Sequence, residues 1–179
     1  MTSPYDTDLG KNPANYQPLT PLIFLERAAC TFPDHPAIIH GERRYSYAEF
    51  YARSRKLASA LAARGIGKDD TVSVMLANTP AMLEAHYGVP MTGAVLHAIN
   101  TRLDPHIIAF MLDHADAKVL IIDTEFAPVV REALAQARVR PLVINYRDLE
   151  CGVEGERIGD LDYEDFIAGG DPDYPWEMP

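Results

Sequence analysis

Four short apolar runs alternate with helical patterns through the middle of the chain, and this alternation limits the fold more than any other feature. The runs cover residues 71–76, 94–99, 118–122 and 142–145. Between them, apolar residues recur at the three- and four-residue spacing of amphipathic helices. Strands that alternate with helices form a parallel sheet covered by helices. The sequence therefore predicts an α/β fold with a helix-covered, mostly parallel sheet.

The second of these runs lies in the segment Gly93–Leu103, GAVLHAINTRL, which holds the chain's main candidates for ligand contact. We interpret the run as a buried strand, and a helix tail is the alternative because the run is short. Polar residues Asn100–Arg102 follow it, and Asp104–Pro105 starts a new helix. In open α/β sheets, ligands bind at the carboxyl ends of the strands. These polar residues are therefore candidates for ligand contact, with a plain polar turn as the other interpretation.

The strongest local signal is a capping box, SYAE, that begins at Ser46. The hydroxyl of Ser46 can accept a hydrogen bond from the N–H of Glu49, while the Glu49 carboxylate accepts one from the N–H of Ser46. Tyr45 and Phe50 occupy the two positions of a hydrophobic staple. The pattern predicts a helix that starts after Ser46 and is stopped by Gly65.

Further patterns predict the neighbouring elements. The short segments Ala37–His40 and Arg43–Tyr45 flank Gly41–Glu42, and this arrangement indicates a β-hairpin. A helix should start near Thr79 with one inward face, and another near Asp104. The expected inward residues are Met82, Leu83, His86 and Tyr87 in the first helix, and Ile107, Ile108, Met111 and Leu112 in the second.

Charge and polar composition divide the chain into three predicted parts. The net charge is −10, and residues 148–179 hold 11 acidic residues but one basic residue, which leaves 15 of each in residues 1–147. We expect an extended arm over 1–18, an α/β subdomain over 19–147, and an acidic, linker-like tail over 148–179 that leads to an absent remainder and contains one short helix at 163–168. Because no basic stripe exists, binding to nucleic acid is not expected.

Composition and motifs exclude several other classes. No apolar run approaches the roughly 18 residues of a membrane span, and the N-terminus does not have the pattern of a secretory signal. Cys30 and Cys151 are far apart, which favours a reduced, cytoplasmic setting. The six histidines have no metal-ligand spacing, so no metal site is expected. A free-standing flavodoxin-like module is disfavoured because no phosphate-binding turn follows a strand.

Two single residues, His97 and Asp123, remain as candidates for a site. His97 lies in the central segment and could line a pocket. Asp123 follows a predicted strand, where it could face a ligand or cap the next helix. His86 is expected to pack on the apolar face of its helix rather than to act in catalysis. None of these patterns amounts to an active site.

Two motifs resemble those of a known superfamily. RRYSYAEF at Arg43–Phe50 resembles the first core motif of the adenylate-forming (AMP-binding) enzymes. Gly93–Leu103 resembles their second core motif, in the form typical of fatty-acyl and related acyl-CoA synthetases. Residues 76–84 and 114–123 are also similar, and the resemblance covers about 19–170 in the correct order.

The resemblance implies that the chain is the first part of the large N-terminal domain of such an enzyme. The family joins a carboxylic acid to AMP with release of pyrophosphate, and then transfers the acyl group to CoA. The complete enzyme would therefore use ATP, Mg²⁺, CoA and a small-molecule carboxylic acid. The residues carried over are motif members with an expected architectural role: Tyr45, Ser46, Tyr47, Glu49, Gly93 and Asn100.

The family's Gly-rich phosphate loop, ribose-binding Asp and catalytic Lys are absent from this sequence. No catalytic, cofactor-binding or metal-binding residue can be carried over, and we expect the chain itself to be inactive. We also expect it to self-associate, as a homodimer, through apolar surface. Alternatives are an adenylation domain that serves a carrier protein, an aromatic-acid CoA ligase, or a non-catalytic interaction domain.

Overall fold

The computed structural model describes residues 10–12, 14, 16–153, 155–159 and 161–178. Much of the expected N-terminal arm, residues 1–9, 13 and 15, lies outside the described residues. The described residues between 10 and 19 contain no helix or strand.

The centre of the molecule is a five-stranded sheet in the order β4-β3-β5-β6-β7. Each neighbouring pair is parallel. The strands are β3 (Thr71–Met75), β4 (Val95–Ala98), β5 (Ala117–Asp123), β6 (Leu142–Tyr146) and β7 (Leu161–Asp162). The prediction of a helix-covered parallel sheet is confirmed.

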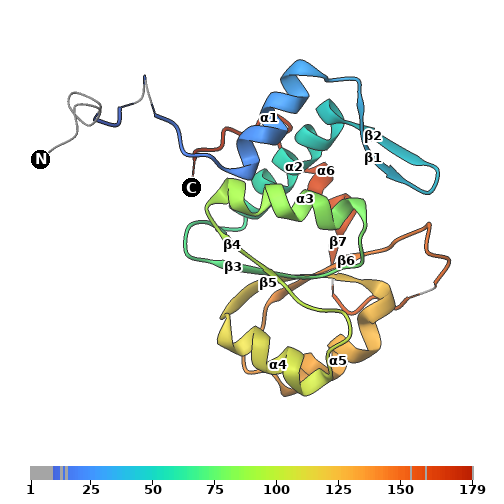
Figure 1. The fold of residues 1–179 in the computed structure, drawn as a ribbon. Coiled ribbons are helices and arrows are strands. Elements are labelled where there is room, and N and C mark those ends of the chain that lie inside the picture. Colours follow the sequence, from blue (N-terminus) through green and yellow to red (C-terminus); the bar gives the residue numbers. More distant parts are fainter. Residues whose placement is uncertain (1–9, 13, 15, 154, 160, 179) are drawn as a thin grey trace, which may run out of the picture.

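Helices cover both faces of this sheet (Figure 1). One face carries α2, α3 and α6, with α1 packed on α2, and the other face carries α4 and α5. The bounds are α1 (Pro21–Thr31), α2 (Tyr47–Ala62), α3 (Pro80–Gly88), α4 (Pro105–His114), α5 (Ala127–Gln136) and α6 (Tyr163–Ala168). Short 3-10 turns, η2 (Pro90–Thr92) and η3 (Thr124–Phe126), and the antiparallel hairpin β1 (Pro36–His40) and β2 (Arg43–Ser46) complete the fold.

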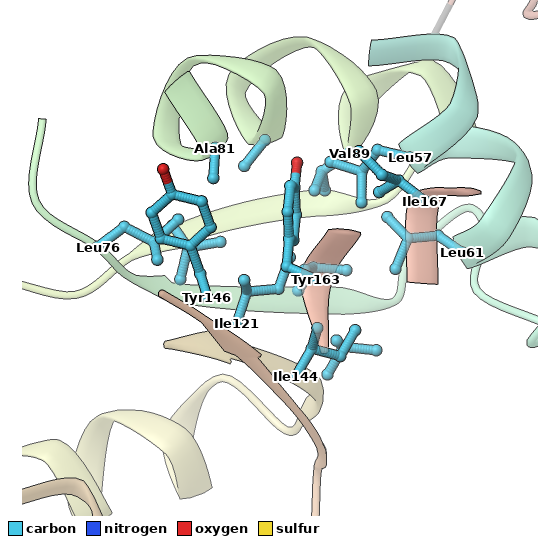
Figure 2. Packing of buried hydrophobic residues seen from close by; sticks show 14 of the residues in the cluster. Leu57, Leu61, Leu76, Ala81, Val89, Ile121, Ile144, Tyr146, Tyr163 and Ile167 are labelled. Carbon is cyan, nitrogen blue, oxygen red and sulfur yellow. The ribbon is translucent and has the colours of Figure 1, made fainter. Parts of the chain in front are cut away.

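Two main hydrophobic clusters form the core, one on each face of the sheet. The cluster under α2, α3 and α6 includes Leu57, Leu61 and Ile121, and Figure 2 shows these side chains converging from helix and sheet. Tyr146 and Tyr163 meet edge to face in this cluster, with ring centroids 5.6 Å apart. Edge-to-face contact is a favoured geometry for aromatic pairs. The two rings therefore fix α6 against β6.

Strand β4 is an edge strand, so the prediction of a buried strand at this position is wrong. Val95 is 55% exposed, and β4 pairs only with β3 among the described residues. The apolar run does form a strand, and Asn100 follows its carboxyl end as predicted. A run of apolar residues signals a strand but does not reveal its position in the sheet, because that position depends on the order of all strands.

The predicted inward face of α3 is confirmed for Met82 and Tyr87, which pack against the core, and is wrong for the other two residues. Leu83 and His86 are exposed, whereas Ala81, Glu84, Ala85 and Gly88 are buried. Gly88 packs so close to α2 that a Cβ added there would lie 2.7 Å from the Ser54 carbonyl oxygen. Close packing of two helices requires small side chains at the contact, and Gly88 meets this requirement where α3 crosses α2. In α4 the prediction is confirmed for Ile108 and Leu112, which are buried, and for Met111, which packs against the core. It is wrong for Ile107, which is 37% exposed.

Part of the expected acidic tail is packed against the domain. Residues 161–168 form β7 and α6, and Tyr163 and Ile167 are buried in the core. Further on, the Trp176 indole N–H donates a hydrogen bond to the Tyr51 hydroxyl of α2, at 2.9 Å. The short helix at 163–168 has the predicted bounds. Its burial was not predicted, because the acidic composition of this segment is typical of a linker.

Candidate functional site

The carboxyl ends of β3, β4, β5 and β6 lie at one edge of the sheet, since these strands are parallel. Asn100 follows β4, Asp123 ends β5, and Tyr146 ends β6, with Asp148 two residues later. Ligands of open α/β sheets bind at this edge. We therefore treat it as the candidate functional site.

Asn100 shapes the turn that follows β4. Its Oδ1 accepts a hydrogen bond from the Arg102 N–H at 2.9 Å, and its side chain is otherwise exposed. This contact is an Asx turn, in which the side chain replaces a backbone acceptor. The contact gives Asn100 a role in fixing the loop.

Asp123 is a buried carboxyl group at this edge with a shifted pKa. It is 1% exposed, and its Oδ1 accepts a hydrogen bond from the Glu125 N–H at 3.2 Å at the start of η3. Its Oδ2 is buried and has no hydrogen-bond partner among the described residues. Burial raises the pKa of the Asp123 carboxyl to about 6, although the hydrogen bond from Glu125 opposes this. Of the two roles considered from the sequence, the geometry places Asp123 as a cap.

Asp148 joins the hairpin to the end of β6. Both of its carboxylate oxygens lie 2.9 Å from His40 Nε2, and Asp148 is 5% exposed. Nearby, a cavity of 310 Å³ opens between β2, the end of β6 and the start of α6. Its lining includes Arg43, Tyr45, Tyr146, Arg147 and Tyr163.

The first motif is built around the start of α2. The Ser46 hydroxyl accepts from the Glu49 N–H at 3.2 Å, and the Glu49 carboxylate accepts from the Ser46 N–H at 2.7 Å, so the predicted capping box is present. Tyr45 and Tyr47 pack against the buried Phe50. Ser46 and Glu49 thus cap the helix, and Tyr45 and Tyr47 pack at its start. All four motif residues therefore have a structural role.

The second motif lies at the other side of the sheet, on β4. Gly93 adopts a left-handed conformation with φ of +80°, which favours glycine. His97 Nδ1 lies 2.9 Å from the Ser73 hydroxyl of β3. Burial lowers the pKa of the His97 imidazole, and nearby His114 lowers it further. The hairpin and β4 lie apart in the fold (Figure 1), so the two motifs do not form one site.

A buried polar network that the sequence did not reveal connects α2, α3 and α6. The Glu84 carboxylate is fully buried and accepts hydrogen bonds from Arg53 Nε at 2.5 Å and from the Tyr163 hydroxyl at 2.7 Å. Arg53 also bonds Glu164. Burial raises the pKa of the Glu84 carboxyl, while Arg53 and Tyr163 oppose this. The one available signal was an acidic residue among apolar ones in α3.

Within the described ranges, no three His, Cys, Asp or Glu side chains are grouped so that they could hold a metal ion. We assign none of the described residues to Mg²⁺, ATP or CoA. The helices of the described part of the chain include none that is both long and apolar enough to cross a membrane.

The fold defines an α/β protein with a helix-covered parallel sheet, and comparison with known proteins gives the family. The family model "AMP-binding enzyme" matches residues 25–165. The chain belongs to this AMP-binding enzyme family, which confirms the resemblance found in its two motifs.

Relatives within the family are CoA ligases. The chain is 45% identical over 183 aligned residues to a peroxisomal acetate/butyrate–CoA ligase of Arabidopsis thaliana, covering 96% of this chain and 32% of the relative. It is 42% identical to an acetate–CoA ligase of Humulus lupulus, with the same coverage. A peroxisomal trans-cinnamate:CoA ligase of Petunia hybrida is 41% identical, with 93% of this chain and 32% of that protein covered. The chain thus spans about a third of the length of these relatives.

Solved structures support the fold. An anthranilate CoA ligase in complex with anthranoyl-AMP superimposes with a TM-score of 0.79 at 20% identity, covering 88% of this chain and 29% of that one. A benzoate CoA ligase from Burkholderia xenovorans LB400 superimposes with a TM-score of 0.73 at 23% identity, covering 88% of this chain and 30% of that one.

Proposed function

We propose that this chain supplies the N-terminal third of an acyl-CoA synthetase. The complete enzyme joins a small carboxylic acid to CoA through an acyl-adenylate, uses ATP and Mg²⁺, and releases AMP and pyrophosphate. The observation that carries this proposal is the 45% identity, over almost the whole chain, to an acetate/butyrate–CoA ligase.

A short aliphatic acid is the proposed substrate class, because two of the relatives named above carry acetate in their names. An aromatic acid is the second candidate, supported by the cinnamate ligase at 41% identity. An adenylation domain for a carrier protein and a non-catalytic interaction domain remain alternatives to test. We place the enzyme in the cytoplasm, and the peroxisomal names of two relatives make peroxisomes the competing location.

The proposal assigns this chain a supporting role rather than the chemistry. Its motif residues Ser46, Glu49 and Asn100 stabilise helix and loop geometry through the contacts described above. We propose that the chain alone is inactive, because its sequence holds neither a Gly-rich phosphate loop nor the family's catalytic Lys. Single groups that stabilise developing charge are worth about 10²–10³ in rate, so the loss of several leaves no measurable turnover.

The test is a pyrophosphate-release assay on two proteins. One is the chain itself, and the other is a chimera in which residues 1–179 replace the matching third of the Arabidopsis acetate/butyrate–CoA ligase. Both receive ATP, Mg²⁺, CoA and a panel of aliphatic, aromatic and amino acids. We expect no pyrophosphate from the chain and acyl-CoA formation from acetate or butyrate by the chimera.

The unmodified Arabidopsis enzyme is the control for the chimera. Pyrophosphate release by the chain alone would overturn the claim of inactivity. A folded chimera that activates no acid would overturn the ligase assignment, and activation of amino acids without transfer to CoA would favour the carrier-protein alternative.

A further inference from the structure

The last residues that the structure describes pass back across the domain. α6 ends at Ala168, and residues 169–178 then run without helix or strand across α2 toward the start of α1 (Figure 1). There the hydroxyl of Thr20, the residue before α1, donates a hydrogen bond to Met178 Sδ at 3.3 Å. We call residues 169–178 the strap, because they cross α2 and join the end of α6 to the start of α1.

The strap begins with a close backbone contact at Gly170. A Cβ added to Gly170 would lie 2.1 Å from the Lys56 carbonyl oxygen of α2, a distance that only a glycine permits. At Gly169 an added Cβ would meet no atom within 4 Å outside its immediate neighbours. Neither glycine has a positive φ. The two adjacent positions therefore differ in their contact with α2 and not in their need for a special backbone conformation.

Two polar contacts hold the middle of the strap on α2. Arg55 Nη2 donates a hydrogen bond to Asp173 Oδ1 at 3.1 Å, and the Trp176 indole N–H donates one to the Tyr51 hydroxyl at 2.9 Å. Tyr51 and Arg55 are four residues apart, so they lie on one face of the helix. The Arg55 guanidinium also lies 4.3 Å from the centre of the Tyr51 ring. The two contacts are therefore linked through their partners on α2.

Apolar packing adds to these contacts. Tyr174 and Trp176 of the strap pack in a cluster with Leu22 of α1, Ala58 of α2 and Met91 of η2, all three of which are buried. Aromatic rings bury a large area for each residue and so contribute strongly to packing. The strap is thus held both by side-chain burial and by hydrogen bonds, over three separate elements of the domain.

This path sets the point at which the chain leaves the domain. Successive Cα atoms are about 3.8 Å apart, so in the proposed enzyme the first residue of the remainder lies within about 8 Å of Met178 Cα. Met178 borders a cavity of 360 Å³ whose lining also includes Gly93, the first residue of the second motif. Detached, a flexible segment of ten residues would instead have an end-to-end distance of about 17 Å, varying continually.

We propose that the strap fixes the exit point of the chain, and that Gly170, Tyr51 and Trp176 are positioning residues for the catalytic remainder of the enzyme. They act by holding the strap, which keeps the remainder at one place relative to this domain. Ordering a connection in advance removes an entropic cost from later assembly steps. The inference rests on the proposed function, because it concerns the remainder that the ligase assignment implies.

Positioning has a kinetic signature that differs from loss of folded protein. Substrates that contact both parts of the enzyme bind the arranged state better than the loosened state. If only a fraction of the enzyme is arranged, the apparent dissociation constant rises by the inverse of that fraction, so KM rises while kcat at saturation is kept. Partial unfolding instead lowers the apparent kcat and leaves KM unchanged.

The first experiment compares Gly170→Ala with Gly169→Ala in the chimera of this chain and the Arabidopsis ligase. The methyl group at position 170 collides with the α2 backbone and displaces the strap, whereas the one at position 169 is accommodated. We expect Gly170→Ala to raise KM for ATP and for the acid by about tenfold, with kcat within about twofold. Gly169→Ala is the matched control and should behave like the unmodified chimera.

The second experiment does not depend on the folding of Gly170→Ala. Trp176→Phe removes the donor and Tyr51→Phe removes the acceptor of one hydrogen bond, and each keeps an aromatic ring. Each variant of the chimera should raise KM by about fivefold, the ratio that corresponds to one net hydrogen bond. The double variant should raise KM by the same factor, because both changes remove the same contact. Tyr87→Phe is the control, since Tyr87 packs in the same cluster while the Trp176 indole bonds Tyr51.

The third experiment reads the attachment of the strap on the chain itself, without activity. NMR follows the exchange of the Trp176 indole proton with solvent, which a hydrogen bond slows. We expect exchange to be faster by about tenfold or more in Gly170→Ala, because release of the strap opens this bond. Gly169→Ala should exchange like the unmodified chain.

The outcomes separate this inference from the ligase assignment. An active chimera whose KM is the same with Gly170→Ala and with Gly169→Ala would overturn the positioning role alone. A lower kcat at unchanged KM in Gly170→Ala and in both Phe variants would show a purely structural role and would also overturn it. Equal indole exchange in the two Ala variants would show that the strap is not held on α2. An inactive unmodified chimera would overturn the ligase assignment and the positioning role with it.

Discussion

The two edges of the sheet differ in length, charge and covering. β7 has two residues and leads directly into α6, whose first turn is capped by Asp162 and whose Tyr163 and Ile167 are buried. β4 has four residues, is half exposed, and is followed by the loop at Asn100. Among the described residues, the acidic segment thus follows its edge strand with a helix anchored in the core, while the apolar motif segment follows its edge strand with an exposed turn. This difference shows that the hydrophobicity of a segment does not decide how firmly it is attached to the core, because the acidic segment supplies buried Tyr163 and Ile167.

The largest expected loss of stability comes from the buried network that attaches α6, the helix that follows the β7 edge. Replacement of Glu84 by Ala removes the acceptor for Arg53 and for the Tyr163 hydroxyl and leaves Arg53 partly buried beside an apolar site. Breaking a buried ion pair in this way costs about 3–5 kcal/mol. We expect the free energy of unfolding in urea to fall by this amount.

The control for this prediction is Glu164→Ala, which removes the other partner of Arg53 but whose side chain is 49% exposed. Exposed ion pairs are worth about 0–1 kcal/mol. If the two variants lost the same stability, the network would not hold α6 to α3 as described.

A pair of truncations compares the two edges directly. Ile167 is 2% exposed and packs in the core under α6, so Ile167→Ala should cost about 2–5 kcal/mol. Val95→Ala should change stability by no more than about 0.5 kcal/mol, because Val95 is 55% exposed on the β4 edge. Urea unfolding of dilute, monomeric protein measures both. Similar losses in the two variants would contradict the difference between the edges.

A smaller change in the free energy of unfolding, and one that depends on pH, is expected from Asp123 on β5, the strand midway between the edges. The pKa of Asp123 is raised to about 6 in the folded chain, whereas an unfolded Asp titrates near pH 4. Between these values the folded state binds more protons than the unfolded state, so this group makes the free energy of unfolding fall as pH rises. Asp123→Asn removes that contribution. Relative to this variant, the unmodified chain should lose about 2 kcal/mol between pH 4 and pH 6.5.

Urea unfolding across this pH range measures the difference, and Glu177→Gln, at an exposed position, is the matched control. A constant difference between the unmodified chain and Asp123→Asn over the range would show that Asp123 is not perturbed in the folded state.

Sequence patterns correctly predicted the elements whose structure depends on residues close to one another in the sequence. The capping box at Ser46, the hairpin around Gly41 and the helix over 163–168 all depend on contacts within a few residues, and all three were predicted correctly. Gly65 has the left-handed conformation expected after a helix, with φ of +79°.

The errors concern properties that depend on distant residues. The edge position of β4 follows from strand order, and the face that α3 buries depends on its contact with α2 through Gly88. The partners of Glu84 lie 31 and 79 residues away in the sequence, so no local pattern could indicate the buried network. For the candidate site, the sequence placed Asn100 and Asp123 at the correct edge, but the hydrogen bonds that hold them required the structure.

Trp176 gives the chain a built-in optical probe. It is the single tryptophan among 179 residues, and its indole N–H is bonded to Tyr51 on α2. Fluorescence excited at the indole therefore reports whether residues near the C-terminal end of the chain are attached to α2. Far-ultraviolet circular dichroism reports the helices and sheet as a whole. The order in which the two signals change during denaturation distinguishes release of the terminal segment from unfolding of the domain, without any added label.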